Sequence, residues 1–342
     1  MIITSAIFWI FLFIVLLVYF IIPKNSQWIV LLIASYVFYL FSGYGMVTFL
    51  LFTTTISFFA GIILEKINND SKNYFDNNKS LTKEQRKEFK SIIEGKKRSV
   101  IFISIMLIFC VLGFLKYYNF FSLNLTTLSN KLSINLDLPS LQILLPLGIS
   151  FYTFQSVGYI IDINRGKIKA DKNFPKFALF LSFFPQIIQG PISRYDQLAK
   201  QLYESHSFKY DRIKFGFQLV LWGLFKKMVI ADRLAIPVNN IFNNYLEYEG
   251  FSIFVGVLFF SFQMYCDFSG GIDIARGISE VMGINLVENF QRPFFSTSID
   301  EYWRRWHITL GSWMREYVFY PLSLSKAFTK LGRSLRKAFG NY

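Results

Sequence analysis

Long apolar segments recur along almost the whole chain, and they constrain its fold more than any other feature. A straight helix needs roughly 20 apolar residues to cross the hydrocarbon layer of a bilayer. Because backbone in lipid must satisfy its own hydrogen bonds, such runs predict an all-α, polytopic membrane bundle whose shorter segments are tilted, re-entrant or buried. The apolar runs occupy residues 2–22, 28–41, 46–64, 100–121, 141–163, 174–188, 215–230, 251–268 and 303–322.

Composition agrees with a membrane protein. Hydrophobic residues make up 53% of the chain and charged residues 17%, whereas soluble domains carry about 25% charged residues. The net charge is +14, but the lysines and arginines gather in loops between apolar runs, so we expect a lipid bilayer and no nucleic acid as the partner. Cys110 and Cys266 lie in apolar runs, which predicts neither a disulfide framework nor a metal site.

The distribution of basic residues predicts the orientation. Residues 2–22 lack a basic leader and a small-residue cleavage site, so we interpret them as a retained helix rather than a signal peptide. Residues 65–99 are rich in lysine and arginine and are predicted to form a cytoplasmic loop, which places the N-terminus outside the cell. The lysine-poor segment 122–140 is then expected outside. Within the cytoplasmic loop, residues 81–90 are typical of a solvated surface helix, with a helical hairpin as the alternative.

His307, one of two histidines, lies in an apolar and tryptophan-rich segment. The S-x-x-E pattern at 298–301 predicts a helix that begins near Ile299. A titratable group at membrane depth is a functional candidate, because keeping it there is costly. A neutral imidazole can accept a proton from a hydroxyl that attacks a thioester; the alternative is a buried, structural histidine. The predicted helix face holds Asp300, Trp303, His307, Leu310 and Met314, with Arg304, Arg305 and Arg315 nearby.

Two other polar segments interrupt apolar runs. Asp267 and Asp273 flank Ser269-Gly270-Gly271, which predicts either a broken helix that lines a cavity or carboxylates with a structural, helix-capping role. Residues 183–194 contain two prolines and a glycine, which break helices. Such a segment is typical of a pathway lining or of an interfacial turn.

Two basic or titratable positions have simpler interpretations. The pair Lys226–Lys227 could hold a cofactor phosphate, but such pairs more often anchor a helix at the level of the lipid headgroups. His206 lies in a polar stretch and is expected to be exposed and passive.

A series of motifs, in the same order, resembles the membrane-bound O-acyltransferase (MBOAT) family. The resemblance is greatest to the bacterial branch that includes alginate and peptidoglycan O-acetylation proteins and the D-alanyl transfer protein for teichoic acid. The motifs are YIIDINRG at 159–166, FFPQ and GPISR within 174–194, GLFKK with Ala231-Asp232, YCDFSGG at 265–271, ENFQRPFF at 288–295 and EYWRRWHITLGSW at 301–313.

This resemblance implies a helical fold around a tunnel through the membrane. It also implies that an acyl thioester, either acyl-CoA or an acyl-carrier protein, enters from the cytoplasm and meets a hydroxyl acceptor or an acyl-relay protein from outside. The family's W-R-R-W-H histidine maps to His307. The family's second histidine, in a later W-H-G motif, has no counterpart here, so we expect a single domain over residues 1–342 that lacks its C-terminal part.

From the residues and the resemblance together, we expect a multi-pass O-acyltransferase of the cell membrane. It would transfer an acetyl group to hydroxyls of a cell-wall or exported polysaccharide. The alternatives are D-alanyl transfer from a carrier protein to teichoic acid, and a non-catalytic membrane scaffold or truncated inactive fragment. His307 is the expected catalytic residue, with no metal and no tightly bound cofactor. The expected substrate-binding residues are Arg304, Arg305, Trp303, Asp267, Ser269 and Gln189.

Overall fold

Helices form nearly all of the regular structure in the computed structural model, which describes residues 3–41, 43–134, 138–141 and 147–340. These residues contain no β-strand, only an isolated antiparallel bridge between Phe290 and Trp306. The all-α prediction is therefore confirmed. The chain divides into two compact units, which are Met1–Ile188 with Arg194–Ile213 and Met282–Ile284, and Gln189–Ser193 with Lys214–Val281 and Asn285–Tyr342.

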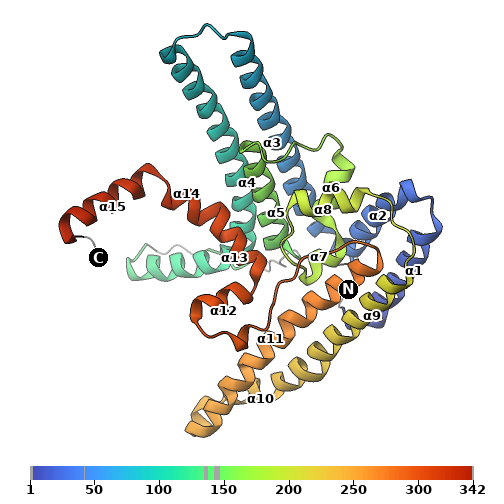
Figure 1. The fold of residues 1–342 in the computed structure, drawn as a ribbon. Helices are drawn as coiled ribbons and strands as arrows, with labels where there is room; N and C mark the ends of the chain where they lie inside the picture. Colours follow the sequence, from blue (N-terminus) through green and yellow to red (C-terminus); the bar gives the residue numbers. More distant parts are fainter. Residues whose placement is uncertain (1–2, 42, 135–137, 142–146, 341–342) are drawn as a thin grey trace. The chain divides into compact units, whose positions relative to one another are not determined.

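The first unit contains the N-terminal helices (Figure 1). Their cores follow the apolar runs, since α2 covers most of the second run and the fourth run lies inside α4. The run at 174–188 is divided between α6 and α7, as the prolines predict. The helices are α1 Ala6–Ile21, α2 Gln27–Leu40, α3 Tyr44–Asn77, α4 Lys83–Lys131, α5 Ile149–Asn164, α6 Phe174–Ser182, α7 Phe184–Gln189 and α8 Tyr195–Tyr203.

The second unit contains most of α9 and all later helices, and π-helical turns continue two of these helices. Such turns are rare and often mark functional sites. The helices are α9 Tyr210–Leu224, the π-helix Phe225–Ala231, α10 Asp232–Asn243, α11 Gly250–Val281, α12 Ile299–Arg305, α13 Ile308–Met314, the π-helix Arg315–Phe319, α14 Tyr320–Ser323 and α15 Lys326–Phe339.

Among the described residues, α3, α4 and α11 are long and apolar enough to cross a membrane. They have 34, 49 and 32 residues, and α1 is a shorter apolar helix. The prediction of a membrane protein is confirmed by these helices. Several other runs form helices that are too short to span alone, as expected for re-entrant or buried segments, whereas a tilted span would need a longer helix.

The segment 65–99 is helical rather than a loop. Residues 83–90 form an exposed helix, as predicted, and this helix is one arm of a helical hairpin. Helices α3 and α4 both continue into it, and a short turn joins them. Thr82 and Gln85 close a capping box at the start of α4, and the rings of Tyr74 and Phe89 stack with centroids 3.8 Å apart. Good helix formers and this contact carry the helices beyond the apolar runs. The segment predicted outside, 122–140, is likewise helical as far as Lys131.

A cluster of polar groups in the first unit is hydrogen-bonded around Asp171. The Asp171 carboxylate accepts hydrogen bonds from the hydroxyls of Tyr195 and Tyr203 at 2.7 and 2.8 Å, and the Asp171 N–H donates to the Tyr159 hydroxyl. Tyr159 also packs against Gly61, where a Cβ would lie 2.8 Å from its ring. These contacts tie the loop after α5 to helices α3 and α8 and to α5 itself.

His206 is not passive, contrary to the expectation from its polar neighbours. Its backbone N–H donates to Gln27 Oε1 at 2.7 Å, and its carbonyl accepts from Gln27 Nε2 at 2.8 Å. Its ring packs on Gly283, where a Cβ would lie 2.7 Å from Nδ1. Gln27 is buried, so the pairing satisfies an amide that would otherwise be costly to bury. Gln27 lies far from His206 in the sequence, so the polar neighbours of His206 do not indicate this contact.

Two pairs of glycines bring α9 and α11 together in the second unit. A Cβ on Gly216 would lie 2.7 Å from the Gly277 carbonyl oxygen, and one on Gly223 would lie 2.6 Å from that of Gly270. The glycines on each helix lie about two turns apart and therefore on one face. Helix α11 runs unbroken through Gly270 and Gly271, so the predicted helix break is wrong. These glycines serve close backbone approach instead.

Candidate functional site

His307 lies at a break between two short helices, not on the face of one continuous helix. The Ser298 hydroxyl accepts from the Glu301 N–H at 3.1 Å, so α12 begins at Ile299 as predicted. It ends at Arg305, Trp306 is extended, and His307 adopts the left-handed conformation with φ 44°. The predicted alignment of His307 with Asp300 and Trp303 on one helix face is therefore wrong.

Pairing with a distant segment explains the break. In a continuous helix, the Ile308 N–H would donate to the Arg304 carbonyl. It donates instead to the Asn289 carbonyl at 3.0 Å, and the Gln291 N–H donates to the Arg305 carbonyl at 3.0 Å. These two bonds make the bridge between the 289–291 segment and the break. They satisfy backbone groups that the interrupted helix leaves without partners.

The half-buried His307 ring contacts aromatic rings and one amide. Its centroid lies 4.8 Å from that of Phe268, with the rings perpendicular, and Phe290 lies parallel to it at 6.5 Å. The amide of Asn289, which is 1% exposed, contacts Nδ1. His307 lies outside the three candidate spans, and burial lowers its pKa to about 4. The imidazole is therefore neutral near pH 7.

A chain of hydrogen bonds fixes the Asn289 amide. The N–H and the hydroxyl of Thr309 both lie 2.9 Å from Asn289 Oδ1. The Ile192 N–H donates to the Thr309 hydroxyl oxygen at 3.1 Å. His307 Nδ1 lies 3.1 Å from Asn289 Nδ2 and 3.2 Å from Oδ1. The position of His307 is thus fixed by a hydrogen-bond network that includes the backbone N–H groups of Ile192 and Thr309.

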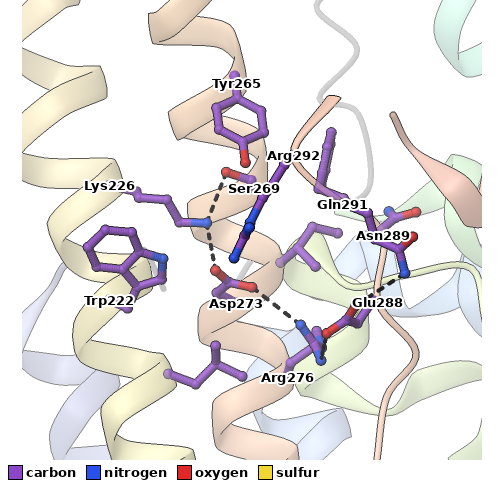
Figure 2. Close-up of a pocket in the computed structure, with 13 residues that line it drawn as sticks. Trp222, Lys226, Tyr265, Ser269, Asp273, Arg276, Glu288, Asn289, Gln291 and Arg292 are labelled. Carbon is purple, nitrogen blue, oxygen red and sulfur yellow. Dashed lines mark hydrogen bonds and ion pairs between the residues drawn. The ribbon is translucent and has the colours of Figure 1, made fainter. Parts of the chain in front are cut away.

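A polar cavity shares Asn289 with this network, and Figure 2 shows the residues that line it. It has a volume of about 440 Å³. Asn289 and Phe290, which contact His307, also form part of its wall. The remaining polar wall comes from α11, from the π-helix after α9 and from the segment before α12. The charged or polar side chains in this wall are Lys226, Tyr265, Ser269, Asp273, Arg276, Glu288, Gln291 and Arg292.

A line of ion pairs crosses the cavity wall. Lys226 Nζ lies 2.6 Å from Asp273 Oδ2 and 3.0 Å from the Ser269 hydroxyl. Arg276 lies 3.6 Å from Asp273 and 3.1 Å from Glu288. The Lys226 side chain is only 8% exposed, so it does not anchor a helix at the headgroups. A buried charge is tolerated only with such partners.

The structure separates the six predicted substrate-binding residues. Ser269 lines the cavity beside His307, whereas Asp267 pairs with Lys227, which also lies 3.1 Å from Asp232. The Gln189 side chain packs against Gly271.

The three predicted residues on α12 lie away from that cavity. Trp303 is 61% exposed. Arg305 pairs with Glu301, and Arg304 pairs with Asp300. Arg304 and Asp300 also line a separate pocket of about 560 Å³ together with Arg315, Phe319 and Tyr320.

Sequence reasoning missed several residues of the site. Asn289 and Thr309 received no role, although both lie inside the motifs that carry the family resemblance. Ser269, Asp273 and Arg276 share one face of α11 at helical spacing, and a polar stripe on an apolar helix is a signal that could have found Arg276. Glu288 also lies inside one of these motifs, but its pairing with Arg276 on another element has no local signal.

These features define a class of protein, namely a helical membrane protein with a neutral imidazole beside a polar cavity. The chain belongs to the membrane-bound O-acyltransferase family, whose family model matches residues 166–336. Asn289, His307 and the cavity wall all lie inside the matched region.

Similar proteins include both O-acetylation and D-alanylation enzymes. A probable alginate O-acetylase AlgI of Pseudomonas syringae is 37% identical over 65% of this chain and 42% of its own length. A peptidoglycan O-acetyltransferase of Helicobacter pylori is 32% identical over 66% of this chain and 47% of its length. A teichoic acid D-alanyltransferase of Bacillus subtilis is 34% identical over 51% of this chain and 44% of its own length. The chain spans less than half the length of these relatives.

Proposed function

We propose that the protein acts as a membrane O-acyltransferase that transfers an acetyl group from a thioester to hydroxyls of a cell-wall or exported polysaccharide. The observation that carries the proposal is the neutral His307, which lies in the family's W-R-R-W-H motif beside a polar cavity. The names of the alginate and peptidoglycan relatives support an acetyl group and a polysaccharide.

The proposed reaction is balanced without any group beyond donor and acceptor. The acceptor oxygen bonds to the acyl carbon, the carbon–sulfur bond breaks, and the hydroxyl proton ends on the released thiol. A neutral imidazole can assist in two ways. It can accept the hydroxyl proton, or it can donate a hydrogen bond to the oxyanion that develops on the acyl carbon.

The donor is proposed to be acyl-CoA or an acyl-carrier protein on the cytoplasmic side. Both carry phosphate, which arginine side chains bind well because their fork of donors matches its geometry. The pocket lined by Arg304 and Arg315 supports this role. We propose a location in the cell membrane with the N-terminus outside, and an extracytoplasmic relay protein or the polysaccharide itself as acceptor.

D-alanyl transfer to teichoic acid is the second candidate, favoured by the 34% identity to a teichoic acid D-alanyltransferase. The same site would serve both reactions, because only the acyl group and the acceptor differ. The released product separates the two candidates. Mild alkali frees acetate from an O-acetylated polymer and D-alanine from a D-alanylated one.

The test is performed with the gene in its own host. His307→Ala is expected to lower the ester-linked acyl group on the polymer by about 10²-fold or more, the scale of a lost acid–base or oxyanion group. His206→Gln, which removes the other histidine, is expected to retain acylation at equal protein level. Unchanged acylation in His307→Ala would remove His307 from the mechanism, and unchanged acylation after deletion of the gene would favour a scaffold.

A further inference from the structure

We propose that Asn289 is a positioning residue that holds the proton of neutral His307 on Nε2, which makes His307 a hydrogen-bond donor in the site. The position of the proton follows from contacts within the second unit alone. Only the catalytic use of that proton rests on the proposed function.

Backbone donors determine which way the Asn289 amide points. The oxygen and nitrogen of an amide are distinguished by their partners. A backbone N–H can only donate, so the amide atom that lies 2.9 Å from the Thr309 N–H must be the oxygen. The Ile192 N–H donates to the Thr309 hydroxyl oxygen, which leaves the hydroxyl proton free to point at Asn289 Oδ1, also 2.9 Å away. Both lone pairs of Oδ1 are then occupied.

The remaining atom of the amide determines the His307 tautomer. Asn289 Nδ2 has only hydrogens to offer, and it lies 3.1 Å from His307 Nδ1. This contact is favourable only if Nδ1 presents a lone pair. A proton on Nδ1 would meet the hydrogens of Nδ2, and its other partner, Oδ1 at 3.2 Å, already accepts two bonds. A neutral His307 therefore carries its proton on Nε2.

The consequence is a specific chemical role. The Nδ1 lone pair is engaged by Asn289, so the ring has no free acceptor. No partner for Nε2 is found among the residues that the structure describes, which leaves its N–H available to a ligand oxygen. Such a donor stabilises the oxygen of an acyl group as negative charge develops on it. His307 therefore binds that oxygen and does not remove the acceptor's proton.

Nitrogen-15 NMR tests the tautomer directly. The full chain is labelled at histidine and reconstituted in lipid nanodiscs at pH 7.5. Only two histidines contribute, and the signals that vanish in His307→Gln are those of His307. We expect Nδ1 to have the chemical shift of an unprotonated ring nitrogen and Nε2 that of a protonated one. The reverse pattern in the wild-type chain would overturn the inference, whatever the activity.

Variants of the network test its cause. Asn289→Asp replaces the donating amide by a carboxylate that only accepts, and the proton should move to Nδ1. Thr309→Val frees one lone pair of Oδ1, so the Nδ1-protonated form should appear beside the first, whereas Thr309→Ser should retain the wild-type spectrum. If neither Asn289→Asp nor Thr309→Val changes the shifts, Asn289 does not position the proton. If Asn289→Asp does not fold, the spectrum of Thr309→Val alone shows whether Asn289 positions the proton.

The spectra separate this inference from the proposed function. An inactive chain with the proton on Nε2 retains the positioning role of Asn289 and rejects only the catalytic use of His307. An active chain with the proton on Nδ1 supports the transferase and rejects the inference. Activity without His307 rejects the catalytic use of the site but does not affect the tautomer.

Discussion

The fold imposes two unfavourable features on His307, a left-handed backbone and a lowered imidazole pKa. Its backbone is left-handed, which costs about 1–2 kcal/mol for a residue with a Cβ, and burial depresses the pKa of its imidazole. The pairing of the break with Asn289 and Gln291 stabilises the backbone conformation. Such combinations cluster where function requires a fixed geometry, which agrees with the role proposed for this residue.

The depressed pKa of His307 makes a prediction about acid stability. The unfolded histidine titrates near 6.5, whereas the folded one titrates near 4. Below pH 6.5 the unfolded state therefore binds a proton that the native state does not, and stability falls as pH decreases toward 4. In detergent, the unfolding temperature of the wild type should decrease between pH 7 and 4.5 more than that of His307→Gln. Parallel curves for the two proteins would contradict the shift.

The Lys226–Asp273 pair makes a second prediction at the residue scale. Breaking a buried pair costs up to about 3–5 kcal/mol, and without Lys226 the Asp273 carboxylate keeps only the longer contact with Arg276 at 3.6 Å. We therefore expect Lys226→Met to destabilise the chain strongly, and Lys226→Met/Asp273→Leu to recover part of the loss. The matched control is Lys200→Met, which breaks the exposed pair with Glu204 at 3.7 Å and should cost less than about 1 kcal/mol. Chemical unfolding of the purified variants measures the difference.

At the scale of elements, α9 and α11 pack through glycine rather than through large apolar side chains. Between helices in lipid there is little hydrophobic driving force, so close van der Waals contact and small residues become decisive. The two glycine pairs provide this contact about two turns apart. The resulting short separation also places Lys226 against Ser269 and Asp273. The glycines thus set the distance on which the cavity wall depends.

Alanine at one of these glycines should disturb both packing and site. The Cβ of Gly223→Ala would lie 2.6 Å from the Gly270 carbonyl, so the helices must separate, at a cost of about 1–3 kcal/mol. Gly95 on α4 has nothing within 4 Å, and Gly95→Ala should stabilise the chain by about 0.5–1 kcal/mol. Unfolding midpoints measured side by side test this. Equal effects of the two substitutions would show that the close approach is unimportant.

Local patterns predicted elements well and connections poorly. The apolar runs correctly indicated α3, α4 and α11, because hydrophobicity is a property of each segment alone. The capping pattern correctly placed the start of α12 at Ile299. The break at His307 was missed because it depends on pairing with Asn289 and Gln291. These residues lie outside the predicted helix, so the spacing of residues within that helix does not indicate the break. Charge partners such as Lys226 and Asp273 were missed for the same reason.

At the scale of the whole molecule, the charge of +14 is distributed unevenly along the chain. A large share of the lysines and arginines lies in the hairpin formed by the ends of α3 and α4. Helix α4 is 49 residues long, which corresponds to about 74 Å if straight, far more than the ~30 Å hydrocarbon layer. Its apolar part can therefore cross the membrane while its basic start lies outside the lipid. The positive-inside rule then predicts a cytoplasmic hairpin.

Cysteine labelling tests this orientation at both ends of α4. In a chain with both native cysteines replaced by serine, Lys79→Cys lies at the basic turn and Asn130→Cys near the far end of the helix, and both side chains are exposed. In right-side-out vesicles, a membrane-impermeant maleimide should label Asn130→Cys at once and Lys79→Cys only after permeabilisation. The reverse pattern would invert the topology and move the N-terminus inside. If both positions react before permeabilisation, the two ends of α4 share one side, and α4 does not cross the membrane.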